Sequence, residues 1–96
     1  MFKIVARLRV QKEKIEEFKK TAKELIEKSS SEEGNVFYTL NQDTKDQQKF
    51  AFIECWKDEE AMKIHESSLH FTELFPLLTQ MTESAGEIDL YEEIEF

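Results

Sequence analysis

The sequence contains few of the residues that mark several common classes of protein. Its 96 residues include one cysteine, one proline and two glycines. A single cysteine cannot form an intramolecular disulfide, so a disulfide-stapled extracellular domain is excluded. The scarcity of proline and glycine, together with a hydrophobic content of 40%, excludes collagen-like and low-complexity chains. We therefore expect residues 1–96 to form a single globular domain.

Basic residues are outnumbered by acidic ones, and long hydrophobic runs are missing. The chain has 13 Lys and Arg against 21 Asp and Glu, which gives a formal net charge of −8 at pH 7. Such a surface repels phosphate backbones and anionic lipids, so we expect neither nucleic acid nor a membrane as a partner. The longest hydrophobic run covers residues 50–53, far too few to span a bilayer. These features predict a cytoplasmic protein with a reduced cysteine.

Hydrophobic periodicity predicts four strands and two helical stretches. Hydrophobic and polar residues alternate over 2–10, 35–43 and 87–96, whereas the strand over 48–56 is hydrophobic on both faces and is expected to be central. Helical spacing begins at Glu13, and a second helical stretch is interrupted at Ser67 and Ser68. Pro76 is expected to kink or restart that stretch. The order β-α-β-β-α-β predicts an α+β, ferredoxin-like fold, an antiparallel sheet with its helices on one face.

Three positions are expected to set the ends of the helices. Gly34 can adopt the positive φ that stops the first helix. Asp58 and Ser68 are expected N-caps, because their side-chain oxygens can accept hydrogen bonds from the first turn of a helix.

The sheet face away from the helices is expected to be hydrophobic. The third strand offers large hydrophobic side chains to both sides, and the second strand offers either Phe37 or Tyr38. Exposed hydrophobic faces of several hundred Å² are rare on monomers, so we expect a second copy to cover this face in a two-fold homodimer. The alternative is that the C-terminal tail or the interrupted helix folds over it.

The two histidines are the side chains whose usual pKa lies nearest to neutrality. Five residues apart on one continuous helix, His65 and His70 would point about 140° from each other, which is wrong for a shared metal ion. A helix break at Ser67 and Ser68 would let them meet around one cavity. The alternative is that one histidine caps a helix and the other is solvated.

Glu54 lies on the same face of the third strand as Phe52 and Trp56. A carboxylate among aromatic side chains needs a partner or has a raised pKa. One interpretation is a general base or a hydrogen-bond anchor for a phenolic substrate. The other is an ion pair with Arg7 or Arg9 on the neighbouring first strand.

An ordered set of short motifs resembles the antibiotic biosynthesis monooxygenase family. The set covers nearly the whole chain and consists of Glu33-Gly34-Asn35, Tyr38, Gln42-Asp43, the segment Glu54–Ala61, His65 and His70-Phe71. The resemblance implies a dimeric α+β barrel. It also implies a small oxygenase that oxidises quinols or other phenols with O2 and needs no flavin, haem or metal. The sequence itself contains no glycine-rich phosphate loop and no cluster of cysteine and histidine.

The resemblance also implies which residues carry the chemistry. An apolar pocket, a base and hydrogen bonds to a developing oxyanion are what such a reaction requires. We expect catalytic roles for His65, His70 and Glu54. The expected substrate-pocket residues are Tyr38, Trp56, Phe71, Asn35 and Arg7.

Two other functions remain as alternatives, and a third, haem degradation, is not expected. Haem-degrading relatives use an asparagine on the first strand and a histidine on the last helix, where this chain has the segment 4–9 and Phe75, so haem is not expected. Members that process the autoinducer-2 signal share the Glu-Glu-Gly-Asn arrangement and would bind a phosphorylated ketone through Arg7 or Arg9. The last alternative is a non-catalytic dimer that binds a small ligand.

Overall fold

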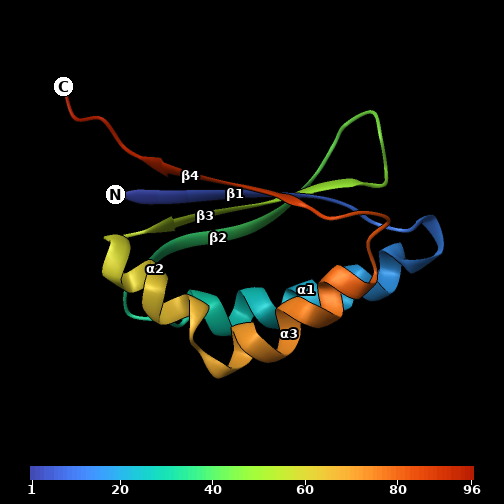
Figure 1. Ribbon diagram of the computed structural model, residues 1–96, viewed down its shortest axis with the longest axis horizontal. Coiled ribbons are helices and arrows are strands. Elements are labelled where there is room, and N and C mark those ends of the chain that lie inside the picture. The colour runs from blue at the N-terminus through green and yellow to red at the C-terminus, as the bar shows by residue number, and fades with distance from the viewer.

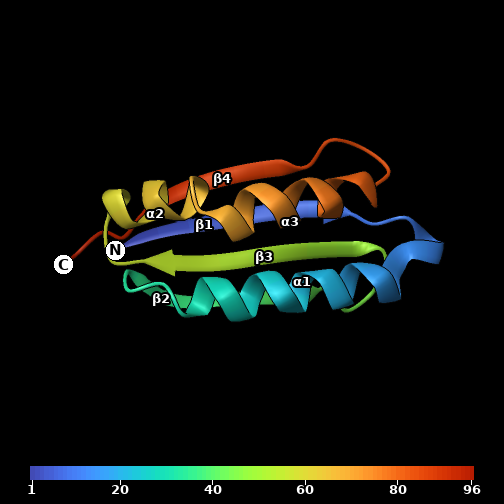
Figure 2. The same ribbon diagram turned by 90° about the horizontal axis from the view of Figure 1, so that it is seen from below.

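The computed structural model describes residues 1–96 and contains the predicted elements in the predicted order. They are β1 (Phe2–Arg9), the 3-10 turn η1 (Lys12–Lys14), α1 (Ile15–Ser30), β2 (Asn35–Gln42), β3 (Lys49–Trp56), α2 (Glu59–Glu66), α3 (Leu69–Gln80) and β4 (Glu87–Glu92). The helices pack on one face of the sheet, with α1 and α3 side by side (Figures 1 and 2). The α+β, ferredoxin-like prediction is confirmed. No helix has both the length and the hydrophobicity needed to cross a membrane.

The four strands form one antiparallel sheet in the order β2-β3-β1-β4. The strand over 49–56 is therefore central, as its two hydrophobic faces predict. Side chains along β1 and β3, the two middle strands, point alternately to the two faces of the sheet, so every second one faces the helices. Those on the helix side are buried: Ile4, Ala6 and Leu8 of β1, and Phe50, Phe52, Glu54 and Trp56 of β3.

The opposite face of the sheet is less aromatic than we expected. Every large aromatic side chain of β3 faces the helices, and the other face of this strand carries Ala51, Ile53 and Cys55. Neither the C-terminal tail nor the interrupted helix covers this face. The helices lie on the other side, and Phe96 at the end of the tail is fully exposed (Figure 1).

The predicted caps form and explain where the second helical stretch is interrupted. The Asp58 carboxylate accepts a hydrogen bond from the Ala61 backbone N–H at 2.8 Å, and the Ser68 hydroxyl accepts one from the Phe71 N–H at 3.3 Å. Helix α3 then runs through Pro76 without a restart. Strand β4 ends at Glu92 rather than at residue 96, because Glu92 already pairs with Phe2, the first residue of β1.

Gly34 has a different role from the predicted one. It has no positive φ, so it does not stop α1 by adopting a left-handed conformation. A Cβ atom at this position would instead lie 2.3 Å from the Cβ of Ala61 in α2. Glycine is therefore required for the close approach of the loop after α1 to the start of α2.

Candidate functional site

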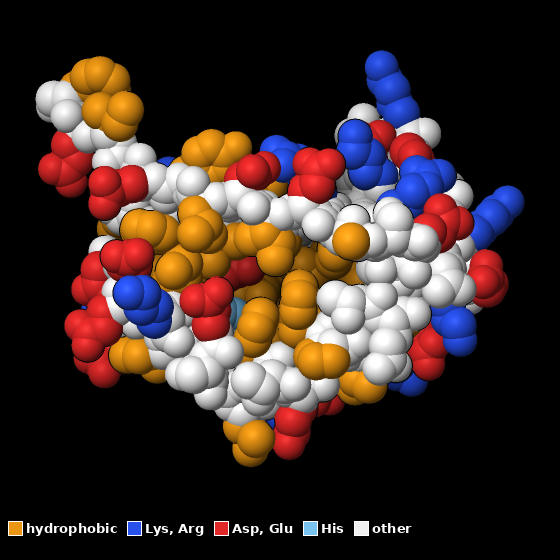
Figure 3. All heavy atoms as spheres, viewed as in Figure 1, with side chains coloured by type: hydrophobic (Ala, Val, Ile, Leu, Met, Phe, Trp, Pro, Cys, Tyr) orange, Lys and Arg blue, Asp and Glu red, His pale blue; other side chains and the backbone are white.

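A hydrophobic hollow lies between β4 and the helices α2 and α3 (Figure 3). Ile88 and Leu90 pair with Ala6 and Ile4 of β1, so their side chains also face the helix side of the sheet. They nevertheless remain 57% and 54% exposed, because the helices do not cover this edge strand. Within the hollow, an acidic side chain and a histidine are visible among the hydrophobic ones (Figure 3).

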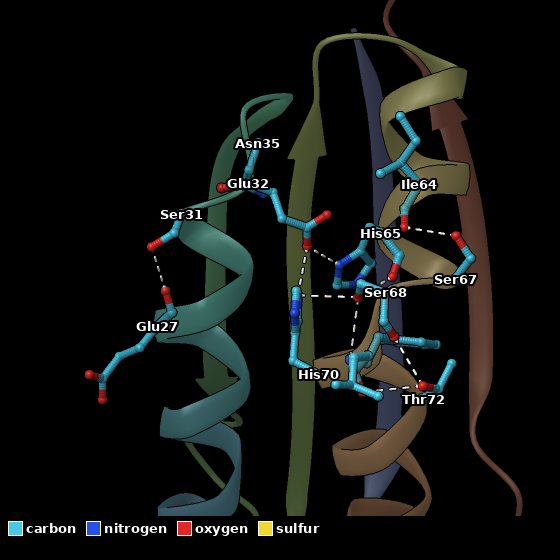
Figure 4. A network of polar contacts seen from close by, with 12 residues as sticks. Glu27, Ser31, Glu32, Asn35, Ile64, His65, Ser67, Ser68, His70 and Thr72 are labelled. Carbon is cyan, nitrogen blue, oxygen red and sulfur yellow. Dashed lines mark hydrogen bonds and ion pairs between the residues drawn. The ribbon is translucent and has the colours of Figure 1, made fainter.

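Three side chains from three different segments meet beside α2 and α3 (Figure 4). Glu32 comes from the loop after α1, His65 from the last turn of α2 and His70 from the first turn of α3. One oxygen of the Glu32 carboxylate, Oε2, lies 2.6 Å from His65 Nδ1 and 2.9 Å from His70 Nε2. The helix break at Ser67 and Ser68 thus brings the two histidines together, which is one of the two interpretations that the sequence left open. The alternative with a solvated histidine is wrong, since their side chains are 1% and 18% exposed.

His65 lies at the centre of an aromatic cluster. Its ring centroid is 4.6 Å from that of Trp56, 4.8 Å from that of Phe71 and 5.4 Å from that of Tyr38. Burial lowers the pKa of His65, while the hydrogen bond to Glu32 opposes this shift. A carboxylate only accepts hydrogen bonds, so a neutral His65 donates from Nδ1 and carries its lone pair on Nε2.

The second nitrogen of His65 has no partner. Nε2 is buried and makes no hydrogen bond, and it lies 4.0 Å from Oε1 of Glu54. A buried, unpaired ring nitrogen is uncommon because burial removes its contacts with water. Within this aromatic cluster, Nε2 can accept a proton from a bound molecule.

Glu54 is a buried carboxyl group that accepts a hydrogen bond from a neighbour on the same strand, β3. The Trp56 indole Nε1–H donates a hydrogen bond to Glu54 Oε1 at 3.0 Å. Burial raises the pKa of Glu54 to about 7, although hydrogen bonds from Trp56 and Tyr38 act in the opposite direction. Burial beside this carboxyl group also raises the pKa of the Tyr38 hydroxyl. Near neutral pH, Glu54 can therefore either donate or accept a hydrogen bond.

The second interpretation of Glu54, an ion pair with Arg7 or Arg9 of β1, is wrong. Arg7 lies on the opposite face of the sheet and pairs with Asp89 of β4. Arg9 also points to that side and pairs with Asp46 and Glu83. Glu54 consequently has no cationic partner from β1, which is consistent with its raised pKa.

Two of the expected pocket residues do not reach the cluster. Arg7 cannot line a pocket on the helix side, because alternation along β1 directs it to the other face. The Asn35 amide donates hydrogen bonds to the backbone carbonyls of Phe37 and Cys55, at 3.1 and 3.5 Å. Asn35 therefore stabilises the irregular start of β2 and makes no hydrogen bond to either histidine.

Glu32 was not among the expected site residues, although it is the first residue of the Glu-Glu-Gly-Asn arrangement. It is one of 21 acidic residues, and no periodicity distinguishes it from its neighbours. The available signal was its position directly before Glu33-Gly34-Asn35, in the loop that Gly34 allows to approach α2.

Comparisons with known proteins agree with this architecture. The family model described as "Antibiotic biosynthesis monooxygenase" matches residues 1–76. A Bacillus subtilis protein named "Putative monooxygenase YcnE" is 41% identical over 71 residues, which cover 74% of this chain and 75% of that protein. A conserved protein from Methanosarcina mazei Go1 is 35% identical and superimposes with a TM-score of 0.95, covering 97% of this chain and 92% of that one. A crystal structure described as an antibiotic biosynthesis monooxygenase is 34% identical, with a TM-score of 0.93 over 99% and 100% of the two chains. This chain belongs to the antibiotic biosynthesis monooxygenase family.

Proposed function

We propose that this protein is a cofactor-independent monooxygenase that oxidises a quinol or another small phenol with O2, and that His65 is its general base. The observation that carries the proposal is the unpartnered Nε2 of the buried His65 ring. The other nitrogen of this ring is held by Glu32 at 2.6 Å. Family membership and the monooxygenase names of the relatives support the same reaction class.

The first step of this reaction is removal of a proton from the substrate. A phenolic hydroxyl bound at His65 donates its hydrogen bond to Nε2 and transfers the proton there. The negative charge of Glu32 at Nδ1 then stabilises the imidazolium that forms. One substrate oxygen could hydrogen-bond to both His65 Nε2 and Glu54 Oε1 at about 2.8 Å, because these atoms are 4.0 Å apart. Glu54 would then orient the substrate by a second hydrogen bond.

The phenolate supplies the electrons that O2 needs. It passes an electron to O2, and the two radicals combine to form a carbon–oxygen bond. Loss of water from the resulting hydroperoxide leaves a hydroxylated quinone. The quinol loses four electrons in total, one oxygen atom enters the product and the other leaves as water, so no external reductant is required. The aromatic surroundings of His65 exclude water from the reactive intermediates.

Oxygen consumption with a panel of reduced benzoquinols and naphthoquinols tests this proposal. We expect turnover above the rate of spontaneous oxidation for at least one quinol. Under ¹⁸O2, the product should contain one labelled oxygen atom, detected by mass spectrometry. Oxygen uptake at the blank rate for every quinol, with no labelled product, would rule the proposal out and favour a ligand-binding protein without catalysis. The alternative of a phosphorylated signal is not favoured, since both of its cationic candidates, Arg7 and Arg9, point to the other sheet face.

We further propose that a second copy covers the sheet face opposite the helices. No element of the chain covers that face, and its centre is formed by the half-buried side chains of Val5, Ala51 and Ile53. Phe37 and Tyr91 lie on the outer strands of the same face and are 39% and 49% exposed. Two such faces packed together would bury these side chains in a two-fold dimer.

Substitution of Ile53 by glutamate tests the dimer. The wild-type chain is expected to elute in size-exclusion chromatography with light scattering at twice the 11.4 kDa mass of one chain. Ile53→Glu should give the single-chain mass, because it places a charge at the centre of the interface. Leu69→Glu introduces the same charge on the exposed surface of α3 and should remain dimeric. A wild-type protein with the single-chain mass at micromolar concentration would contradict the dimer.

A further inference from the structure

We propose that Glu32, His65 and His70 bind one divalent transition-metal ion such as Zn²⁺, and that the bound ion switches off the proposed oxygenase. The binding stands on the geometry alone, whereas the switch rests on the proposed function. The sequence argued against a shared ion because two histidines five residues apart on one helix diverge. The break between α2 and α3 removes that objection, since both rings turn to the same carboxylate (Figure 4).

The three side chains offer a ligand set that Zn²⁺ accepts. One ligand atom from each residue lies within 4.8 Å of the others, and the set consists of two imidazole nitrogens and a carboxylate. Zinc binds such nitrogens and oxygens at about 2.0–2.2 Å, which places neighbouring ligand atoms a little over 3 Å apart. Glu32 Oε2 now lies 2.6 Å from His65 Nδ1 and 2.9 Å from His70 Nε2, so each distance would have to lengthen by less than about 1 Å. Three protein ligands also leave a fourth position open for water.

A buried and unsatisfied oxygen also points to a ligand at this cluster. Glu32 Oε1 is buried and has no hydrogen-bond partner, although the other oxygen of the same carboxylate serves both histidines. An unpaired buried carboxylate oxygen is costly. A cation bound by Glu32 would satisfy this charge, with one or both oxygens as ligands.

An acidic cavity shares Glu32 with the cluster. Its volume is about 360 Å³, and four carboxylates line it: Glu32, Glu33, Asp58 and Glu60. Lys57 is the one basic residue in the lining. Glu33, Asp58 and Glu60 are exposed, whereas Glu32 belongs to both the cavity and the histidine cluster. The cavity therefore attracts cations to its lining, which includes the carboxylate that contacts both imidazoles.

The bound ion would change which ring nitrogen of His65 carries the proton. A neutral imidazole has one N–H, which Glu32 now holds on Nδ1. A metal ion on Nδ1 moves this proton to Nε2, which then donates a hydrogen bond and can no longer accept a proton from the substrate. Metal binding at Nδ1 of His65 thus prevents Nε2 from acting as the base.

Titration of the purified protein with Zn²⁺ and with Co²⁺ tests the site. We expect calorimetry to give one ion per chain. The absorption spectrum of bound Co²⁺ should be typical of a low coordination number with nitrogen and oxygen ligands. Glu32→Gln and His70→Asn should each weaken the binding at least about tenfold. Glu66→Gln makes the same change of charge on an exposed neighbour and should bind as the wild type does. Circular dichroism establishes that each variant is folded.

The outcomes separate the metal site from the proposed function. Absence of stoichiometric binding to the wild type, or equal binding by Glu32→Gln and His70→Asn, would overturn the site. Stoichiometric Zn²⁺ should also abolish quinol-dependent oxygen uptake, and a chelator should restore it. Binding that leaves the turnover unchanged would overturn the switch. A protein that binds the ions but never oxidises a quinol would overturn the oxygenase and leave the metal site established.

Discussion

Replacement of His65 by phenylalanine is expected to lower kcat/KM for quinol oxidation by at least about a hundredfold, since a positioned general base contributes about 10²–10⁴-fold. Phenylalanine retains an aromatic ring against Trp56 and Phe71, whose centroids lie 4.6 and 4.8 Å from that of His65. It removes both nitrogens, so the substrate proton has no acceptor. Glu32 keeps His70 as a hydrogen-bond partner at 2.9 Å, which limits the cost to the fold. Steady-state oxygen uptake and thermal unfolding, measured on the same preparation, separate the two effects.

Two further measurements distinguish a general base at position 65 from a histidine that only supports the structure. A phenol that is already ionised in the assay needs no base, so the loss in the His65→Phe variant should be smallest with such a substrate. His65→Ala should regain part of its activity when free imidazole is added, because the small molecule can occupy the space that the ring leaves. Wild-type turnover by a folded His65→Phe protein would show that another group accepts the proton.

Patterns local to one element predicted most of the fold and part of the site. The alternation of β3 placed Glu54 between Phe52 and Trp56 on the buried face, and the register confirms this arrangement. The polar residues at 67 and 68 predicted the helix break that brings His65 and His70 together. In the first case the period of the strand fixes the direction of the side chain, and in the second the capping residue Ser68 marks the break, so local sequence is sufficient.

The rest of the site depends on contacts between segments that are distant in the chain. Glu32 is 33 residues from His65, and a loop residue has no periodicity to show where its side chain points. Arg7 was expected to line the pocket, whereas it forms an ion pair with Asp89 on the other sheet face, because β4 lies beside β1. The hollow itself exists because the helices leave Ile88 and Leu90 uncovered. Such features follow from the packing of elements, which no single segment encodes.

Gly34→Ala is expected to destabilise the protein and to disturb the site at the same time. The new Cβ would lie 2.3 Å from the Cβ of Ala61, closer than real Cβ contacts. The backbone of Gly34 has no positive φ, so the strain is steric and comes from this contact. Because the loop is also held by the hydrogen bond from the Lys57 N–H to the Gly34 carbonyl, at 2.9 Å, it cannot simply swing away. Overpacking of this kind costs about 1–3 kcal/mol of the free energy of unfolding, which urea denaturation measures.

The Gly34→Ala variant should be rescued by removing the methyl group of Ala61, the other partner of the contact. Ala61→Gly alone should cost about 1 kcal/mol, because glycine is unfavourable within a helix. In the double variant, the Cβ of residue 34 faces the Cα of residue 61 at 3.5 Å, an ordinary contact. The double variant should therefore be more stable than the sum of the single effects predicts. Since α2 carries His65 and the Gly34 loop carries Glu32, the same pair should restore the 2.6 Å contact and with it the oxygen uptake lost in Gly34→Ala. Strictly additive costs, or a stable Gly34→Ala protein with full activity, would show that the loop position is not what aligns Glu32 with the base.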